Sequence, residues 1–407
     1  MMEIRGKCNT AICYAAIIED EATEQIRRMC DYEFTRGSKI RIMPDVHAGK
    51  GCTIGTTMTV TDRIVPNIVG VDIGCGMYTV NMGPGEIDFP KLDAAARRIP
   101  SGLSVWGREQ ESFDLSELRC FSDLKNLDRL RRSLGTLGGG NHFIEADVSR
   151  DGIHYLIIHS GSRNLGKQVA DIYQKRAISQ QRDGGLGAER QRIVAELKAQ
   201  GRQREISQAL KKLSESFPAS EVPDDLASLS GEDFQNYLHD VEICQRFARR
   251  SREIMAGLIL DYAGLKGYDA FHTVHNYVDT AEMILRKGAV SAREGELLLI
   301  PVNMRDGSIL ARGKGNPEWN CSAPHGAGRM MSRTKALKTL SLEEYRKSMA
   351  GVYSTSVNAA TLDEAPMAYK SLEDIIGSAR ETADIIEVLR PVYNFKAGEQ
   401  PETAGKS

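Results

Sequence analysis

The sequence predicts an α+β fold in one large domain, with mixed β-sheets surrounded by helices and a helical insertion. Segments that alternate apolar and polar residues, the pattern of half-buried strands, occur in the first and last thirds of the chain. A polar stretch at about residues 168–265 instead has helical spacing. Motifs that carry chemistry are scattered from residue 43 to residue 396, and they have to meet at one site, which argues against independent domains. We therefore expect residues 1–407 to form a single domain.

Composition indicates a globular protein of a reducing compartment. The 407 residues are 41% hydrophobic, enough for a large core, and the net charge of −2 means that a polyanion must be met by local basic patches. The eight cysteines include no C-x-x-C pair and no disulfide-framework spacing, which favours free thiols. No run approaches the roughly 20 apolar residues of a membrane span, and the N-terminus lacks a signal-peptide core. We expect a cytoplasmic protein without membrane association.

The first strand signal is the alternating stretch Lys39–Met43. If that strand continues, Asp45 and His47 share one face, which suits a carboxylate that orients an imidazole beside a metal site. An exposed polar turn is the alternative. A second alternating stretch, Thr53–Val60, follows, so residues up to about 80 are expected to be rich in β-structure and otherwise irregular.

The segment Gly70–Met77 reads G-V-D-I-G-C-G-M and places two anionic metal ligands, Asp72 and Cys75, among residues of minimal bulk. Glycines at this density are costly in backbone entropy unless the chain approaches something closely or adopts positive φ. A metal ion is one such neighbour. The alternative is a tight turn after a buried strand with an inert, core-packed cysteine.

Residues 91–134 are charged and predicted to be helical, and they end at a glycine-rich loop, Gly135–Glu145. Four glycines before N-H-F-I-E give a loop rich in backbone donors that can pass close to a phosphate or a base. Next, the apolar strand Tyr155–Ile158 runs directly into His159 and S-G-S-R, an arrangement expected at a functional strand end. The alternative for His159 is a satisfied histidine at a sheet edge.

The middle of the chain is predicted to be helical and to carry no chemistry. Residues 188–216 look like a solvated helix pair, followed by a break at Phe217-Pro218 and Val222-Pro223. One apolar helix face is then predicted for the next helical block. Its members are Phe234, Leu238, Val241, Phe247, Met255 and Leu258. His154 and His239 are expected to be structural.

The last third carries histidines again, at His272, His275 and His325. A buried strand is predicted at Glu296–Pro301, and His325 lies among small residues that leave its imidazole open to a bulky ligand. Basic residues follow His325 at helical spacings that suit phosphate binding, with an ordinary solvated basic face as the alternative. They are Arg329, Arg333, Lys335 and Lys338.

Taken in order, these segments resemble the RtcB family of RNA-splicing and RNA-repair ligases, of the compact bacterial type. The matching motifs are M-P-D-V-H-A-G-K-G, G-V-D-I-G-C-G-M, G-T-L-G-G-G-N-H-F-I-E, H-S-G-S-R, H-N-Y-V, R-K-G-A-V-S-A, H-G-A-G-R-M-M-S-R-T-K-A and V-Y-N-F-K. Together they are highly specific and extend from Met43 to Lys396, whereas each alone is weak.

The resemblance implies a dinuclear manganese site. By motif position, Asp72, Cys75 and His142 would hold the first Mn²⁺, and Cys75, His159 and His275 would hold the second. Imidazoles with one carboxylate and a shared thiolate suit a mid-row transition metal.

The resemblance also implies a GTP site, with His325 as the residue that becomes covalently attached to GMP. A neutral imidazole is a suitable nucleophile for the α-phosphorus. The positions that match the family's GMP-contacting segments are Asn141, His142, Phe143, Ile144, Glu145, His275, Asn276, Pro301, Val302, Asn303, Met304, Ser308, His325, Gly326, Ala327, Gly328 and Lys396.

The implied activity is the joining of RNA ends in RNA repair or tRNA splicing. A 2′,3′-cyclic phosphate or 3′-phosphate end would be ligated to a 5′-hydroxyl end by a GTP- and manganese-dependent RNA ligase. One alternative, a dinuclear-metal cyclic phosphodiesterase, would need the metal ligands but neither His325 nor Lys396. A non-catalytic RNA-binding module would need neither set.

Three departures from the family pattern stand out. Val302 and Asn303 replace a glycine and a serine near the nucleotide, Asn164 replaces a glycine after H-S-G-S-R, and Val274 replaces the first histidine of H-H-N. We expect them to affect nucleotide preference or substrate range.

Overall fold

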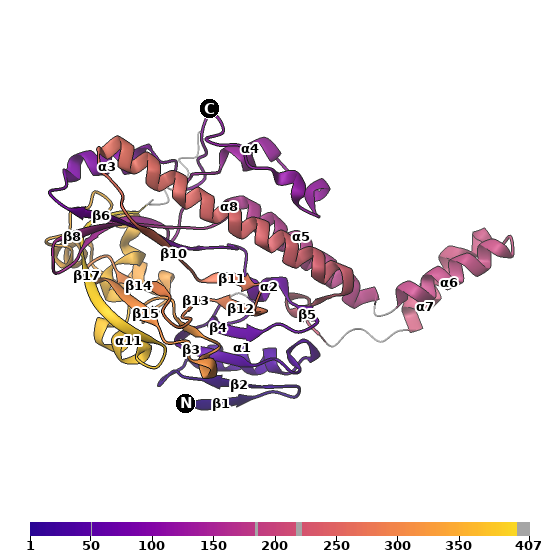
Figure 1. Ribbon diagram of the computed structural model, residues 1–407. Helices are drawn as coiled ribbons and strands as arrows, with labels where there is room; N and C mark the ends of the chain where they lie inside the picture. The colour runs from indigo at the N-terminus through magenta and orange to yellow at the C-terminus, as the bar shows by residue number, and fades with distance from the viewer. Residues whose placement is uncertain (50, 184–185, 217–221, 397–407) are drawn as a thin grey trace.

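The computed structural model describes residues 1–49, 51–183, 186–216 and 222–396. Two large β-sheets form the body, a long helix, α8, lies across them, and a helical arm projects to one side (Figure 1). The predicted α+β class with mixed sheets and surrounding helices is confirmed.

The first sheet has six strands in the order β1-β2-β3-β4-β12-β11, all antiparallel to their neighbours except the parallel pair β2-β3. Both strands predicted in this region exist as β3 and β4, and β3 extends through Asp45 to His47. The strands are β1 Met2–Arg5, β2 Thr10–Cys13, β3 Ile40–His47, β4 Ile54–Thr59, β12 Ile284–Lys287 and β11 Asn276–Asp279. The last third of the chain thus completes a sheet begun by the first third.

The second sheet is antiparallel and has seven strands in the order β10-β6-β8-β7-β17-β15-β14. The C-terminal strand β17 lies between β7 and β15, so residues from every third of the chain meet in this sheet. The strands are β10 Ala270–Val274, β6 Gly76–Pro84, β8 Ile153–Ser160, β7 Phe143–Val148, β17 Ala383–Lys396, β15 Gly307–Gly313 and β14 Leu297–Asn303. The strands predicted at 155–158 and 296–301 are β8 and β14.

Two short ribbons complete the β-structure. They are β13 Ala289–Ser291 with β16 Ser322–Pro324, and β5 Arg63–Ile64 with β9 Leu229–Ser230. Because β16 ends at Pro324, the first ribbon delivers His325 at a fixed place above the sheets.

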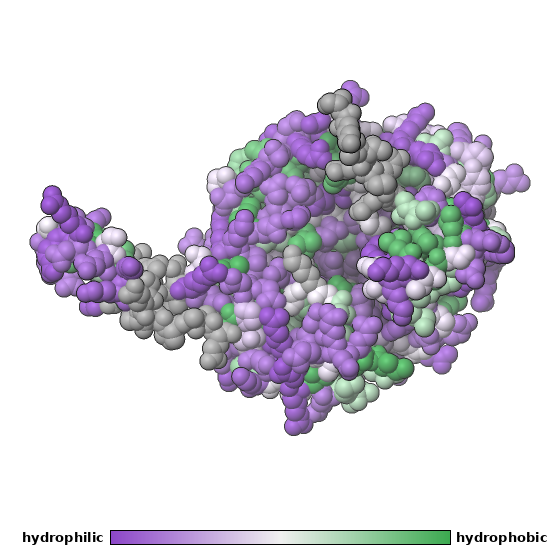
Figure 2. Space-filling model, turned by 180° about the vertical axis from the view of Figure 1, so that it is seen from behind, coloured by the Kyte–Doolittle hydropathy of each residue, from purple (hydrophilic) through white to green (hydrophobic). Residues whose placement is uncertain are grey.

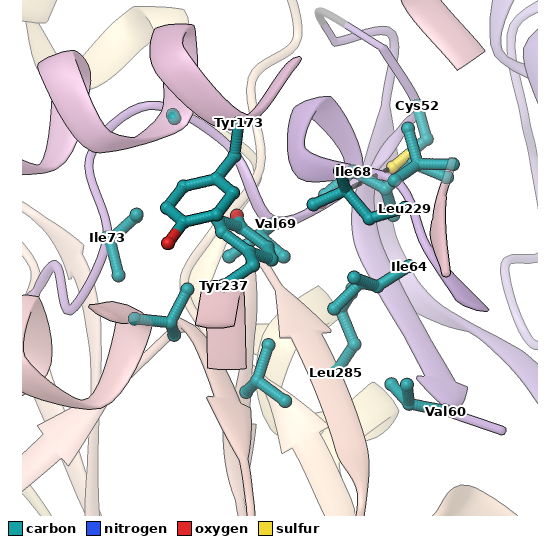
Figure 3. Packing of buried hydrophobic residues seen from close by; sticks show 14 of the residues in the cluster. Cys52, Val60, Ile64, Ile68, Val69, Ile73, Tyr173, Leu229, Tyr237 and Leu285 are labelled. Carbon is teal, nitrogen blue, oxygen red and sulfur yellow. Dashed lines mark hydrogen bonds between the residues drawn. The ribbon is translucent and has the colours of Figure 1, made fainter. Parts of the chain in front are cut away.

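Helix α8, Gly231–Ala263, organises the helical side of the molecule. It packs against α3, Phe89–Arg98, and α5, Arg163–Asp183, and ends at Gly264, whose left-handed φ of 70° is a common helix stop. The predicted apolar face is buried at every position except Leu258, which is partly buried. Figure 3 shows part of the resulting core, where Tyr173 of α5 and Tyr237 of α8 meet Val69.

Two sequence predictions in the first third are wrong in part. Residues 91–134 are mostly irregular, because Pro100, Gly102 and Gly107 follow α3 and no apolar helix stripe continues beyond them. The β-rich segment before residue 80 also contains an amphipathic helix. The helices concerned are α1 Asp20–Cys30, α2 Pro66–Val69 and α4 Leu127–Arg132, with the 3₁₀ turns η2 Leu115–Glu117 and η3 Phe121–Asp123.

The helical arm consists of α6, Leu186–Ala199, and α7, Ile206–Ser216. Figures 1 and 2 show it standing away from the body, with a mostly hydrophilic surface. Side chains from 192 to 213 are exposed or half-buried, as a solvated helix pair requires. The predicted break at Phe217-Pro218 lies outside the described residues.

The remaining helices are short and lie mainly in the last third. They are α9 Arg333–Thr339, α10 Leu342–Ser348, α11 Leu372–Ala379, η1 Glu33–Thr35, η4 Gln203–Glu205, η5 Asp224–Leu226, η6 Pro317–Trp319, η7 Ala359–Glu364 and η8 Pro366–Ala368. Among the helices in the described ranges, none combines the length and apolar character needed to cross a membrane.

Candidate active site

The turn between α2 and β6 presents Asp72 and Cys75 to the interior. Gly70 and Gly74 have positive φ values of 95° and 78°, which favour glycine. A Cβ atom at Gly76 would lie 2.4 Å from the carbonyl oxygen of Thr273, so only glycine fits against β10. These glycines are therefore needed to bring the turn against its neighbours.

Three histidines from different elements meet Asp72 and Cys75. In one triad, His142 Nε2 lies 3.0 Å from Asp72 Oδ2 and 3.4 Å from Cys75 Sγ. In the other, His159 Nε2 lies 3.4 Å from Cys75 Sγ and 3.0 Å from His275 Nε2. The donor atoms of each triad all lie within 4.8 Å of one another, and Cys75 belongs to both triads.

Backbone carbonyls fix the tautomers of two of these histidines. His142 Nδ1 donates to the carbonyl of Leu137 at 2.9 Å, and His159 Nδ1 donates to that of Asn141 at 3.2 Å. In each ring the proton is therefore on Nδ1, and the lone pair of Nε2 points into the cluster. Metal-ligating histidines are oriented in this way.

The chemistry of the donor set fits a pair of mid-row transition metals. Burial raises the pKa of the Cys75 thiol well above its usual range, and the charge of Asp72 adds to the effect. Burial also lowers the pKa values of His159 and His275, so both imidazoles are neutral, the form that can bind a metal. A divalent cation between these groups would convert the thiol to a thiolate.

A buried arginine braces the strands that present this cluster. Arg252 of α8 is 0% exposed, and its Nη1 donates to the carbonyls of Gly74 and Ser160, both at 2.7 Å. Those carbonyls adjoin Cys75 and His159. Burial lowers the pKa of Arg252 to about 10, and the charges of Cys75 and Asp72 oppose that effect. Arg252 therefore ties α8 to both triads.

A cavity of about 230 Å³ opens beside the second triad. Its walls come from both sheets and from the loops of the last third. The lining residues are His47, Met77, Asn141, Phe143, Glu145, His159, His275, Pro301, Val302, Asn303, Met304, His325, Gly326, Ala327, Gly328, Arg329, Arg333, Glu364, Tyr369, Asn394 and Lys396.

Asp45 holds His325 at the junction between the Cys75–His159–His275 triad and the cavity. Asp45 Oδ2 accepts hydrogen bonds from His325 Nδ1 at 2.7 Å and from the His325 backbone N–H at 3.1 Å. The His325 ring centroid lies 5.1 Å from that of His275. The Asp45 carboxylate therefore orients His325, whereas the ring of His47 hydrogen-bonds the Asp45 backbone carbonyl, at 3.2 Å. The predicted Asp45–His47 pairing is wrong, and so is the exposed turn, because Asp45 is buried.

An ion-pair cluster closes the far wall of the cavity around Glu364. Its carboxylate accepts from Lys396 Nζ at 2.5 Å and from the Tyr369 hydroxyl at 2.7 Å. Arg333 and Arg329 contact its other oxygen at 2.7 and 3.4 Å. Burial would raise the pKa of Glu364, but the charges of Lys396 and Arg333 outweigh it and lower the pKa to about 2.

The ion pairs around Glu364 show that the basic residues after His325 do not form the one helix face that the sequence predicted. Arg329 precedes α9 rather than lying on it, and Arg333 is paired with Asp363 and Glu364. Lys335 and Lys338, by contrast, are exposed on α9.

Comparison with known proteins agrees with this geometry. The chain matches the family model described as tRNA-splicing ligase RtcB over residues 25–119 and 108–397. The chain belongs to the RtcB family. It is 30% identical over 420 residues to the RNA-splicing ligase RtcB of Escherichia coli K12, covering 93% of this chain and 95% of that protein. It is 26% identical to the tRNA-splicing ligases RtcB of Aeropyrum pernix, with 86% of each chain covered, and of Archaeoglobus fulgidus, with 92% and 91% covered. This RtcB protein is thus an enzyme of the RNA ligase class.

Most residues predicted to contact the nucleotide line the cavity of this RtcB protein, but four do not. His142 lies in the first triad. Ile144 faces the opposite side of β7, in the core. Asn276 Oδ1 accepts from the backbone N–H of Gly288 at 3.0 Å, and Ser308 is buried behind the wall. For Ile144 the period of two along a strand explains the result, since Phe143 and Glu145 face the cavity.

Sequence reasoning missed several cavity residues, namely His47, Met77, Tyr369, Glu364 and Asn394 as lining groups, and Arg329 and Arg333 as part of the wall. One signal was available for Asn394: it lies two residues before Lys396 in V-Y-N-F-K, and strand alternation puts both side chains on one face. His47, Met77, Arg329 and Arg333 lie within the matched motifs, but the spacing of those motifs does not show which side chains face the cavity. Glu364 and Tyr369 lie outside the motifs.

The departures from the family pattern occupy defined places. Val302 is buried in a core cluster, and Asn303 turns back on its own chain, where its Oδ1 accepts from the backbone N–H groups of Arg305 and Asp306. Asn164 Oδ1 accepts from Gln168 Nε2 one helical turn ahead in α5. Val274 lines a separate cavity under α8.

Proposed function

We propose that this RtcB-family enzyme is a GTP- and manganese-dependent RNA ligase of RNA repair or tRNA splicing. It would join 2′,3′-cyclic phosphate or 3′-phosphate RNA ends to 5′-hydroxyl ends through a GMP–histidine intermediate. The observation that carries the proposal is the position of His325, held by Asp45 between the metal cluster and the cavity. The names of the relatives, RNA-splicing and tRNA-splicing ligases, agree with it.

The contact with Asp45 prepares His325 for nucleophilic attack. Because Nδ1 donates its proton to a carboxylate, Nε2 carries the lone pair. Attack by Nε2 on the α-phosphorus of GTP would form the N–P bond and release pyrophosphate. Asp45 would then stabilise the positive charge that develops on the ring.

The two triads would each hold one Mn²⁺, two per chain, with Cys75 shared. Bound there, the ions would act as Lewis acids that neutralise phosphate charge. Lys396, Arg329 and Arg333 add positive charge around the cavity, partly offset by Glu364.

The guanylylated histidine would serve the joining of RNA ends. A cyclic phosphate is first opened to a 3′-phosphate, which then accepts GMP from His325, and the 5′-hydroxyl displaces GMP as the new phosphodiester forms. A cyclic phosphodiesterase would need the triads alone, so the Asp45–His325 contact favours the ligase.

The experiment is incubation with α-labelled GTP and Mn²⁺, followed by denaturation, in parallel with ligation of RNA that carries cyclic phosphate and 5′-hydroxyl ends. We expect the wild type to take a covalent label and to seal RNA, and His325→Ala to do neither. His154→Ala, at a half-buried position on β8, is the control and should do both. Wild-type protein that opens cyclic phosphates without taking label would instead indicate the phosphodiesterase.

We also propose that residues 1–407 form one domain, because β17 and the β11–β12 hairpin complete sheets begun by the first half of the chain. All eight cysteines lie within the described residues and are free thiols, which supports a cytoplasmic location.

A further inference from the structure

Two carboxylic acids lie side by side on the face of β7 that forms the floor of the nucleotide cavity. Glu145 and Asp147 are two residues apart on the strand, so their side chains point the same way. Glu145 is 3% exposed and lines the cavity. Asp147 is 0% exposed and lies behind Glu145, two residues further along the strand. Asn394 is the cross-strand partner of Glu145 on β17.

The two acids have unequal hydrogen-bond partners. Glu145 Oε2 accepts from Asn394 Nδ2 at 2.5 Å. Neither oxygen of Asp147 accepts a hydrogen bond of good geometry from the described residues. Two carboxylates buried together cannot both be ionised at little cost, and they share a proton instead. The negative charge therefore belongs on Glu145, which has a donor, and the proton on Asp147.

The other groups around the pair leave Glu145 as the acid that titrates near neutrality. Lys396 on β17 is bound to Glu364, whose lowered pKa keeps it ionised. Tyr155 faces Asp147 from β8, and burial raises its pKa. Burial lowers the pKa of His159, the other titratable group of β8 at the cavity. Ser308 on β15 is uncharged.

The pKa shifts of Glu145 and Asp147 agree with a negative charge on Glu145 and a proton on Asp147. Burial raises the pKa of Glu145 to about 7, against the opposing effects of Asn394, Lys396 and a hydrogen bond from Asp147. Burial and the charge of Glu145 raise the pKa of Asp147 well above its usual range, against a smaller opposing effect of the Ser308 hydroxyl. At neutral pH Asp147 is thus an acid that can donate a hydrogen bond.

We propose that Asp147 is a positioning residue that stays protonated, donates its O–H to Glu145, and keeps Glu145 ionised as a hydrogen-bond acceptor toward the nucleobase. The inference rests on the proposed function, in which Glu145 contacts the nucleotide. An ionised carboxylate accepts only, so it favours a base edge with neighbouring N–H donors, as in guanine, over one with a ring acceptor, as in adenine.

The test is the dissociation constant of GMP between pH 5.5 and 9.5 for the wild type and two variants. In the wild type, the affinity for GMP should fall as the pH is lowered and Glu145 gains a proton. Asp147→Leu removes the donor, so the midpoint of this fall should move up by about one pH unit, and the preference for GMP over AMP should narrow. Asp147→Asn keeps a donor that cannot lose its proton, so it should restore the wild-type acid midpoint. It should also abolish the weakening of GMP binding that deprotonation of Asp147 would cause in the wild type at high pH.

If Asp147 had a purely structural role, its replacement would weaken GMP binding by the same factor at every pH. An acid midpoint of GMP binding that is unchanged in both variants would overturn the proposal. A second measurement needs no nucleotide. The infrared difference spectrum of wild type minus Asp147→Asn at pH 7 should contain the carbonyl band of a protonated carboxylic acid, and absence of that band would also refute the proposal. Wild-type protein that shows this band but does not bind GMP would contradict the proposed function and leave the proton assignment standing.

Discussion

Asp45 Oδ2 and His325 Nδ1 lie 2.7 Å apart, although 280 residues separate them in the chain. Strand β3 carries the acid, and the β13–β16 ribbon delivers the histidine, so the contact depends on the folded arrangement of both. Gly328 assists, because a Cβ there would lie 3.0 Å from the carbonyl oxygen of Asp45. A buried carboxylate that accepts from a histidine selects its tautomer and supports the positive charge formed during catalysis.

Replacement of Asp45 by asparagine should therefore slow covalent labelling by GTP more than it weakens metal binding. We expect at least a 100-fold lower rate of label transfer, roughly the scale of a lost catalytic proton partner. Single-turnover labelling with excess enzyme measures this rate. Asp62→Asn, an exposed acid, is the matched control. A rate within threefold of the wild type would show that Asp45 has only a structural role.

Cys75→Ala should lose more bound manganese than any single histidine variant, because the thiol belongs to both triads. The wild type is expected to bind two ions per chain, His142→Ala and His275→Ala to retain part of that, and Cys75→Ala to retain the least. Elemental analysis after dialysis gives the stoichiometry. Cys244→Ala, which removes a buried thiol from α8, should keep both ions. Full occupancy in Cys75→Ala would refute the shared-thiolate assignment.

Glu364→Gln should lower the free energy of unfolding by about 3–5 kcal/mol at pH 7, since it leaves the buried Lys396 without its carboxylate. The folded pKa of Glu364, about 2, lies below the unfolded value near 4.3. Its contribution is thus complete above about pH 5 and is lost as the pH falls toward 2. Urea unfolding at pH 7 and pH 3 should show the gap between the variant and the wild type narrowing. Glu373→Gln, which changes an exposed acid on α11, should alter the free energy of unfolding little at either pH. A difference between Glu364→Gln and the wild type that stays constant with pH would contradict this account.

The basic residues after His325 should separate into two groups. Lys335→Ala with Lys338→Ala removes exposed charge from α9, so RNA binding should weaken and its salt dependence flatten while GTP labelling persists. Arg329→Ala alters the wall of the cavity and should impair labelling as well. Filter binding at several salt concentrations measures the first effect, with Lys347→Ala on α10 as the control. Loss of labelling in the double lysine variant would place those lysines at the GTP site.

The sequence could predict those site residues that lie within short, dense motifs. Glycine density made Asp72 and Cys75 candidate ligands, with an inert core cysteine as the alternative. The resemblance to the RtcB family added His142, His159 and His275, and all five meet in the structure. The β3, β4, β8 and β14 strands also followed from alternation.

Contacts between residues that lie far apart in the chain could not be predicted from local sequence patterns. Nothing local to Asp45 indicates His325, and nothing local to Glu364 indicates Lys396, because each pair forms only when separate segments pack. Charge density between 91 and 134 indicated helix, yet without a regular apolar stripe the chain after α3 gained no packing advantage from that conformation. The pairing of Arg333 with Glu364 likewise could not be seen from helix spacing.

The most direct test of the central claim is to locate the GMP adduct. Wild-type protein labelled with GTP and Mn²⁺ is digested, and the modified peptide is identified by mass spectrometry under neutral conditions, with acid and alkali treatment in parallel. The account predicts a single adduct on His325 whose N–P bond is cleaved by mild acid and survives alkali. A GMP adduct on any other residue, or a bond that resists acid and breaks in alkali, would contradict it.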